Sequence, residues 1–177
     1  DDVESRGLGD VYKRQPYLTF EWKTDNESKY HEVQTRLIGE YNFPNALAAV
    51  TIGHFFGVEP EKIDKALAGY TPQNNRSQLK KTADNTLIID AYNANPTSMM
   101  ASISNFRNMQ AENKMLILGD MRELGKDSAD EHQKIADYLE ECGFKDVVLV
   151  GELFAATRHS YQSYPDVTAP VSYTHLR

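Results

Sequence analysis

The sequence predicts an α/β fold whose second half is a parallel β-sheet with flanking helices. Three short, uninterrupted apolar segments indicate the strands of this sheet, at residues 86–90, 115–119 and 147–151. Such strands are typical of parallel sheets that helices cover on both faces. Two segments with helical periodicity, at about 96–110 and 129–142, lie between the strands and complete a repeating β-α-β order.

The first half of the chain has a different order of elements. Residues 17–22 and 32–38 alternate and are rich in β-branched and aromatic side chains, so we expect two strands joined by a hairpin around residues 25–28. Two helices should follow, at about 44–56 and 60–69, because apolar residues recur at helical spacing and a glycine marks each end.

A polar segment that disfavours helix, residues 71–76, separates these two patterns. We place a hinge and linker there, at residues 73–85. The first domain then covers residues 16–72, and the second covers residues 86–169. A chain of 177 residues has room for two such small domains.

Both ends of the chain differ in character from its middle. VESRGLGDVYKRQ, at residues 3–15, and PVSYTHLR, at residues 170–177, resemble translated adapter sequence. We therefore expect residues 1–15 and 170–177 to be non-native tails that take no part in the fold and carry no function. The alternative is a natural arm at each end.

Charge and cysteine content exclude several classes of function. A net charge of −7 argues against a general binder of nucleic acid or of membrane surfaces, because both are polyanions. The single cysteine, Cys142, lies at helical spacing among apolar residues, so we expect a core residue rather than a nucleophile. No disulfide framework is possible and no apolar run could span a bilayer. We expect a soluble, cytoplasmic monomer without membrane insertion.

Polar residues follow the strand at 86–90, in the sequence IIDAYNANPTSM. Asp90 can accept hydrogen bonds from ribose and Asn93 can donate to phosphate, although ordering of the turn is the alternative role for both. For Asn95 we favour a helix cap. Because right-handed crossovers bring the carboxyl ends of parallel strands to one edge, we expect Asp90, Asp120 and Glu152 to point to the same rim.

A second loop, residues 119–126, follows the next strand and ends in Gly-Lys. It is not a phosphate loop, because five residues separate its glycines and Asp127 replaces the required Ser or Thr. We interpret it as a polar substrate loop. His132, in the helix that follows, could act as a general base, but a solvated or structural histidine is the more common case.

Two amides also flank the start of the helix at 44–56, in the sequence GEYNFPNALAA. Asn42 and Asn45 can each donate and accept, which suits the edge of adenine, although a helix cap is the alternative. In the hinge, Arg76 can reach a nucleotide phosphate, and a solvated surface charge is the alternative.

Four motifs and their order resemble those of the Mur ligases: GEYNFPNALAA, NNRSQ, IIDAYNANPTSM and LGDMRELG, followed by His132. The last two are most similar to those of family members that join D-Ala-D-Ala to UDP-N-acetylmuramoyl-tripeptide through an acyl phosphate. The resemblance runs from about Pro16 to Thr157. It implies that the chain begins within the end of an α/β ATPase domain and continues into a Rossmann-like, dipeptide-binding C-terminal domain.

The resemblance also implies roles for individual residues. Asn42 and Asn45 would border adenine, and the residues implied to contact ribose and phosphates are Arg76, Asp90 and Asn93. The loop from Asp120 to Gly125 would face the dipeptide, and its implied substrate-binding residues are Asp120, Met121, Arg122 and Glu123.

The chain differs from the family in one residue of a motif, and it lacks a large part of the family's sequence. Many relatives have a histidine where this chain has Tyr41. The UDP-binding domain, the phosphate loop and the residues that bind magnesium are missing from the sequence. We therefore expect ATP and Mg²⁺ to be bound mainly by residues outside this chain, which would hold no catalytic or metal-binding residue and would be inactive alone.

Two other classes of protein remain as alternatives. The first is a nucleotide-binding module without catalysis. The second is a dinucleotide-dependent enzyme, which is weaker because no G-x-G-x-x-G pattern follows any of the three strands.

Overall fold

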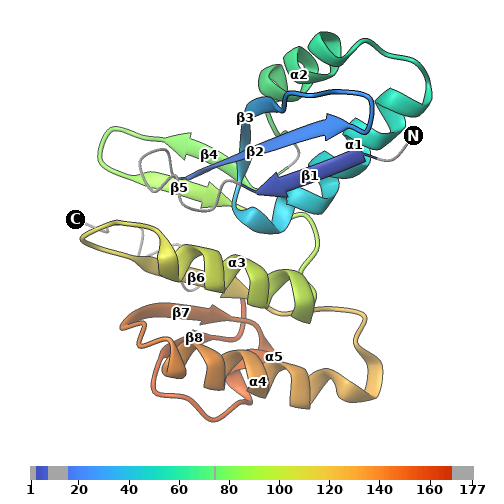
Figure 1. Ribbon diagram of the computed structural model, residues 1–177. Coiled ribbons are helices and arrows are strands. Elements are labelled where there is room, and N and C mark those ends of the chain that lie inside the picture. The colour runs from blue at the N-terminus through green and yellow to red at the C-terminus, as the bar shows by residue number, and fades with distance from the viewer. Residues whose placement is uncertain (1–2, 8–15, 74, 169–177) are drawn as a thin grey trace. The chain divides into compact units, whose positions relative to one another are not determined.

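The computed structural model describes residues 3–7, 16–73 and 75–168. The chain divides into two compact units, with the boundary between Tyr92 and Asn93 (Figure 1). Each unit has its own hydrophobic cluster of buried side chains. Helices in the described part of the chain are too short and too polar to cross a membrane.

The first unit contains a three-stranded antiparallel sheet in the order β1-β2-β3. These strands are β1 (Val3–Gly7), β2 (Tyr17–Thr24) and β3 (His31–Ile38). We expected residues 1–15 to take no part in the fold, but β1 pairs with β2 along its whole length, which corrects that expectation for residues 3–7. Residues 8–15 and 169–177 lie outside the described part of the chain.

Two helices follow the sheet of the first unit, as the sequence predicts. A short 3-10 turn, η1 (Glu40–Asn42), leads into α1 (Phe43–Phe55), and α2 (Pro60–Gly69) comes next. The core between sheet and helices combines alternate residues of the strands with one face of each helix. Its buried members are Leu18, Phe20, Trp22, Val33, Ala46, Val50 and Ile63.

A hairpin completes the first unit, and it corrects the predicted sheet. β4 (Gln78–Lys81) pairs with β5 (Thr86–Ile89) in an antiparallel two-stranded sheet. We expected β5 to be a strand of the parallel sheet and the β4 segment to be linker. The turn between the two strands explains why β5 pairs with β4. The amide of Thr82 donates to the carbonyl of Asn85 at 2.8 Å, and this hydrogen bond closes a tight turn that brings the strands together.

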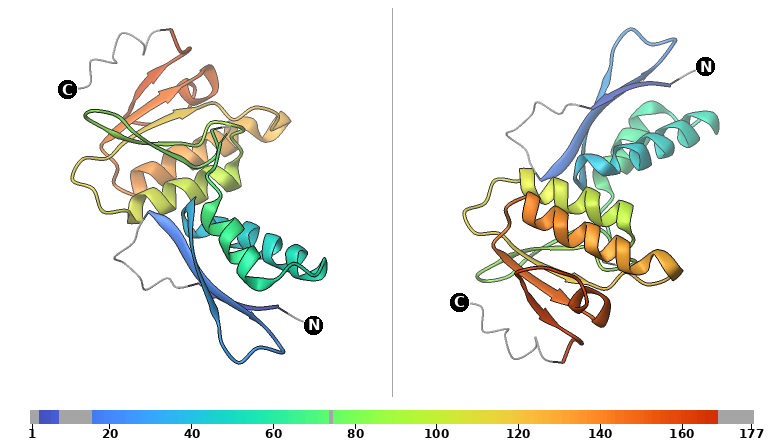
Figure 2. Two further views of the ribbon diagram at one scale, coloured as in Figure 1. Left: turned by 90° about the horizontal axis from the view of Figure 1, so that it is seen from above. Right: turned by 90° about the horizontal axis from the view of Figure 1, so that it is seen from below.

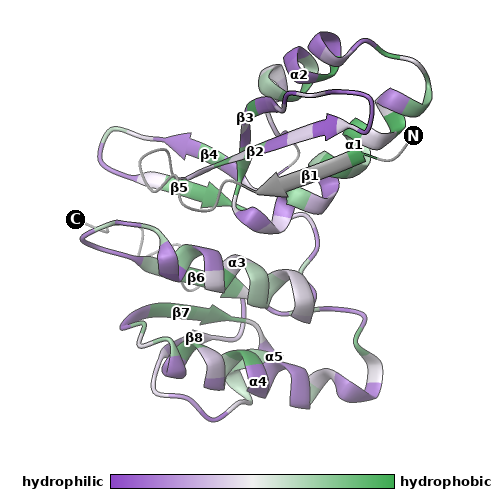
Figure 3. Ribbon diagram, in the orientation of Figure 1, coloured by the Kyte–Doolittle hydropathy of each residue, from purple (hydrophilic) through white to green (hydrophobic). Residues whose placement is uncertain are grey.

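The second unit has the predicted β-α-β order, which confirms the α/β fold class. Its parallel sheet has the order β6-β7-β8, and the last of these strands was not predicted. Figure 3 shows that β7 is hydrophobic along most of its length. The elements of this unit are α3 (Pro96–Asn108), β6 (Met115–Gly119), η2 (Gly125–Asp127), α4 (Ser128–Glu141), β7 (Asp146–Val150), α5 (Glu152–Ala155) and β8 (Gln162–Tyr164).

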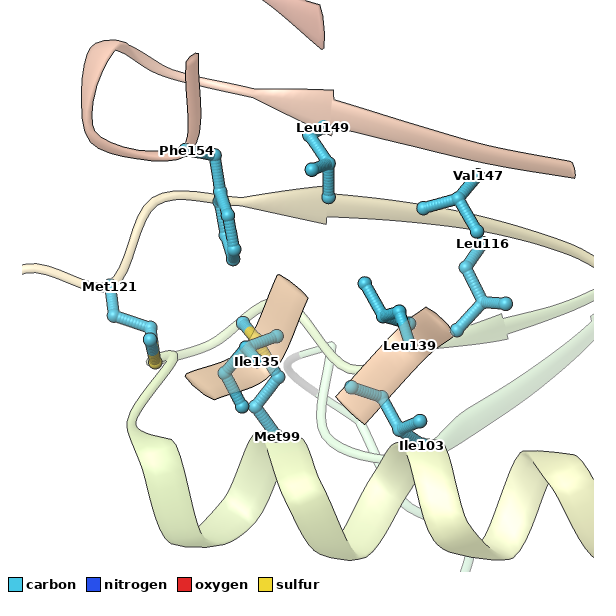
Figure 4. Close-up of a cluster of buried hydrophobic side chains, with 9 residues drawn as sticks. All are labelled: Met99, Ile103, Leu116, Met121, Ile135, Leu139, Val147, Leu149 and Phe154. Atoms are coloured by element: carbon cyan, nitrogen blue, oxygen red, sulfur yellow. The ribbon is translucent and has the colours of Figure 1, made fainter. Parts of the chain in front are cut away.

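Helices α3 and α4 lie side by side on one face of the parallel sheet (Figure 2). Figure 4 shows how their side chains meet those of β6 and β7. The buried members of this cluster are Met99, Ile103, Leu116, Met121, Ile135, Leu139, Val147, Leu149 and Phe154. Asn95 caps α3 as predicted, since its side chain accepts from the amide of Ser98 at 2.9 Å.

Candidate functional site

A chain of hydrogen bonds in the first unit connects the start of α1 to the end of β5. The hydroxyls of Tyr41 and Ser77 share a hydrogen bond of 2.6 Å, and the amide of Ser77 donates to Oδ1 of Asp90 at 3.2 Å. Nearby, the amide of Ala91 donates to the carbonyl of Asn75 at 2.8 Å. Two predicted motifs that are far apart in sequence, GEYNFPNALAA and IIDAYNANPTSM, are thereby joined.

Arg76 is held at the surface by an aromatic side chain. Its guanidinium carbon lies 3.7 Å from the centre of the Tyr92 ring, and both residues are exposed. The neighbours Asn75 and Ser77 both have positive φ, 57° and 44°, so the backbone turns sharply on either side of Arg76. Stacking of this kind restrains a guanidinium without neutralising its charge.

The side-chain amides of Asn42 and Asn45, at the start of α1, already make hydrogen bonds within the first unit. Asn42 donates to the carbonyl of Ile38 at 2.8 Å, and its side-chain oxygen accepts from Asn45 at 3.1 Å. Neither amide caps α1 through its side chain. Asn45 is exposed whereas Asn42 is half-buried, so Asn45 is the more accessible of the pair.

Two of the three residues predicted to share a rim follow adjacent strands of the parallel sheet. Asp120 and Glu152 follow β6 and β7, which are adjacent parallel strands. Asp90 follows β5, which pairs with β4 in the first unit, so it was wrong to expect the strand before Asp90 in the parallel sheet. Asn93 is exposed and is the first residue of the second unit.

The carboxylate of Asp120 binds the start of α5. Its two oxygens accept from the amides of Leu153 and Phe154, at 3.1 Å and 2.9 Å. The amide of Asp120 donates to the carbonyl of Val150 at 3.0 Å. Asp120 is thus held at the edge of the sheet by three hydrogen bonds.

The next loop residue, Met121, is fixed by His132. The Met121 side chain is completely buried in the core of the second unit, and its amide donates to Nε2 of His132 at 3.0 Å. His132 is also fully buried, so the structural interpretation of this histidine is confirmed and the solvated one is wrong. Arg122 and Glu123, which follow in the loop, are both exposed.

A further polar cluster, in the first unit, was not found from the sequence. His31 lies between Oδ2 of Asp64 at 2.9 Å and Oε1 of Glu27 at 3.0 Å, and its ring stacks on Trp22. Trp22 donates to the other oxygen of Asp64 at 2.8 Å. These contacts tie the β2–β3 hairpin to α2. No sequence motif marks them, because Asp64 is far from both partners along the chain.

The His31 cluster perturbs two pKa values. Burial lowers the pKa of His31, but the hydrogen bonds and negative charges of Glu27 and Asp64 outweigh burial and raise it overall. The hydrogen bond from the Thr24 backbone, together with His31, lowers the pKa of Glu27. No group of three or more histidine, cysteine or acidic residues in the described ranges is arranged to hold a metal ion.

Residues 75–172 match the family model described as Mur ligase, glutamate ligase domain. UDP-N-acetylmuramoyl-tripeptide--D-alanyl-D-alanine ligase from Bacillus subtilis is 45% identical over 91 residues, which cover 50% of this chain and 20% of that protein. The protein of the same name from Mycobacterium leprae is 33% identical over 135 residues, which cover 68% of this chain and 26% of the relative. The chain thus spans about a quarter or less of the length of these relatives.

Solved structures show the same similarity. MurF from Acinetobacter baumannii is 30% identical with a TM-score of 0.72, covering 83% of this chain and 33% of that one. MurF ligase from Thermotoga maritima, solved in complex with ADP, has a TM-score of 0.78 at 16% identity and covers 99% of this chain and 40% of that one. The second likeness concerns the fold alone.

Proposed function

Because the chain belongs to the Mur ligase family, we propose that it is part of a ligase that joins D-Ala-D-Ala to UDP-N-acetylmuramoyl-tripeptide during peptidoglycan synthesis. The observation that carries the proposal is the 45% identity to the Bacillus subtilis protein that bears this activity in its name. The lone cysteine supports a cytoplasmic reaction. We further propose that the protein acts as a monomer.

ATP is the proposed nucleotide, and the first unit offers side chains whose chemistry fits it. Arg76 presents a restrained positive charge for phosphate, and Asp90 accepts a hydrogen bond from the amide of the next residue, Ser77. Asn42 and Asn45 keep their proposed place beside adenine, and Asn93 its proposed contact with phosphate. Bound ATP supplies the phosphoryl group that activates the terminal carboxylate of the tripeptide for attack by the dipeptide amine.

The loop from Asp120 to Gly125 is the proposed dipeptide site. D-Ala-D-Ala carries one ammonium and one carboxylate, and the two exposed charged residues of the loop, Arg122 and Glu123, have the complementary charges. Asp120 and Met121 have inward contacts, so we assign them the support of the loop. This division of roles refines the four substrate-binding residues that the resemblance implies.

We propose that Mg²⁺ accompanies the ATP and is held mainly by residues other than those described here, among which no group of three or more histidine, cysteine or acidic side chains is arranged to hold a metal ion. The sequence also contains no phosphate-loop pattern, and we propose that the chain alone does not catalyse ligation.

Two measurements test this proposal. Titration of the chain with ATP and with D-Ala-D-Ala, followed by NMR, should show binding of both ligands, because a ligase fragment needs both. Binding of ATP without dipeptide would favour the non-catalytic nucleotide-binding module. Phosphate release by the isolated chain that depends on ATP and dipeptide would overturn its proposed inactivity.

A further inference from the structure

We propose that His132 is a positioning residue, which fixes the backbone of the Asp120–Gly125 loop so that Arg122 and Glu123 face outward. The identity of the ligand that this loop binds rests on the proposed function, whereas the effect of His132 on the loop backbone does not. The inference is carried by the buried contacts of His132, by the two-sided anchoring of the loop, and by a glycine that leaves room for this anchoring.

The contacts of His132 define which ring nitrogen accepts and which donates. Nε2 accepts the amide hydrogen of Met121 at 3.0 Å, so this nitrogen carries no proton. Nδ1 lies 2.6 Å from the carbonyl oxygen of Ser128, which can only accept, so Nδ1 donates. The ring is fully buried and packs edge-on against Phe154, with ring centres 4.7 Å apart. A buried imidazole with both nitrogens occupied is held in one orientation.

Two consecutive loop residues are thereby anchored to two different helices. Asp120 binds the amides at the start of α5, and Met121 binds His132 of α4. Downstream, Leu124 packs against the core of the second unit. Only Arg122 and Glu123 lie between these anchors, and Glu123 has a left-handed φ of 68°. The loop therefore has little freedom except at the two exposed charged residues.

Gly151 provides the space for this anchoring. Its φ is +127°, and a Cβ placed on it would lie 2.1 Å from Cγ of Asp120. Any side chain at this position would displace the carboxylate from the amides of α5. The start of α5, His132 on α4 and the glycine after β7 together hold the first two residues of the loop.

A pair of substitutions separates positioning from simple stabilisation. His132→Leu removes the acceptor for the Met121 amide, whereas His132→Gln places an amide oxygen near the former position of Nε2. Ala136→Gly is the matched control, because Ala136 is also fully buried on α4 but its methyl group cannot accept a hydrogen bond from the loop. It should destabilise the helix without removing the anchor.

Amide hydrogen exchange of the whole chain, measured by NMR, gives the decisive readout. In the wild type, the Met121 amide should exchange at least about 100-fold more slowly than an unstructured amide. His132→Leu should abolish this protection while Leu149 stays protected, and His132→Gln should restore most of it. In Ala136→Gly, protection of Met121 should change only in parallel with Leu149. Retained Met121 protection in His132→Leu, or a wild-type ring with the proton on Nε2, would overturn the inference.

Titration with D-Ala-D-Ala separates this inference from the proposed function. If the loop binds dipeptide, His132→Leu should weaken binding by about tenfold or more, and His132→Gln should stay within about threefold of the wild type. Equal affinity in His132→Leu would contradict a positioning role. If the wild type binds no dipeptide, the proposed ligand is wrong, and the exchange of the Met121 amide alone decides the role of His132.

Discussion

The hydroxyl of Tyr41 lies 2.6 Å from the hydroxyl of Ser77, and this hydrogen bond joins two motifs that are 36 positions apart in the sequence. Ser77 is buried, and its own amide binds Asp90. Tyr41 is the position at which we expect the chain to depart from the family pattern. The contact therefore connects that departure to the proposed nucleotide-binding segment.

Removing this hydroxyl tests the connection. Tyr41→Phe leaves the buried Ser77 hydroxyl without its partner, so we expect the first unit to lose about 1 kcal/mol of stability and ATP affinity to fall. Urea unfolding and an ATP titration measure the two effects. Tyr70→Phe, at an exposed position, is the control. Unchanged stability in Tyr41→Phe would show that the bond does not hold the segment.

Arg76 should contribute a phosphate contact. Arg76→Ala removes a charged donor, so we expect ATP to bind about tenfold to 100-fold more weakly, with a reduced dependence on salt. Lys65→Ala removes an exposed charge from α2 of the same unit and should leave affinity unchanged. If both variants bind ATP as the wild type does, Arg76 is a surface charge only.

The stability of the first unit should depend on the protonation of His31. Because the pKa of His31 is raised on folding, its contribution is fully present below the unfolded value of 6.5 and is lost as pH rises through the folded value. Glu27 acts in the opposite sense, since its pKa is lowered and its contribution is lost as pH falls below about 4.5. Urea unfolding should therefore show greater stability at about pH 6 than at pH 8.

The single tryptophan, Trp22, stacks on His31 and reports this unfolding directly by fluorescence. His31→Gln should flatten the pH dependence between about pH 6 and 8, whereas His54→Gln on α1 should leave it unchanged. A steep dependence that persists in His31→Gln would assign the effect to another group.

Two glycines with positive φ provide a matched test of the Asp120 anchor. Gly151→Ala would place a methyl group 2.1 Å from Asp120, whereas Gly143→Ala meets no atom within 4 Å. We expect Gly143→Ala to cost about 1 kcal/mol from backbone strain alone, and Gly151→Ala to cost at least about 2 kcal/mol. Thermal unfolding followed by circular dichroism compares them, and equal losses would contradict the close approach of Asp120.

Local signals in the sequence predicted local structure well. Helices α1 to α4 follow from apolar spacing, with glycine stops for three of them, whereas α5 was not predicted. The cap at Asn95 depends on a residue only three positions away. The pairing of β5 could not be predicted in this way, because an apolar strand fits a parallel or an antiparallel neighbour equally well. β8 is too short and too polar to give a strand signal.

Contacts between distant residues account for the missed parts of the site. Neither Tyr41 with Ser77 nor His31 with Asp64 follows a periodic pattern, so only the folded chain brings them together. The same holds for Asp120, whose carboxylate has the correct type for a ligand contact but binds amides 33 and 34 positions later. For these residues, the sequence shows which hydrogen bonds the side chain can make, but it does not show which residue is the partner.

Isothermal titration of the chain with D-Ala-D-Ala, compared with L-Ala-L-Ala, tests the proposed function most directly. We predict that D-Ala-D-Ala binds at least about tenfold more tightly, and that replacing both Arg122 and Glu123 by alanine abolishes the difference. Binding of neither dipeptide, with ATP binding intact, would contradict the assignment of this loop to the ligase substrate.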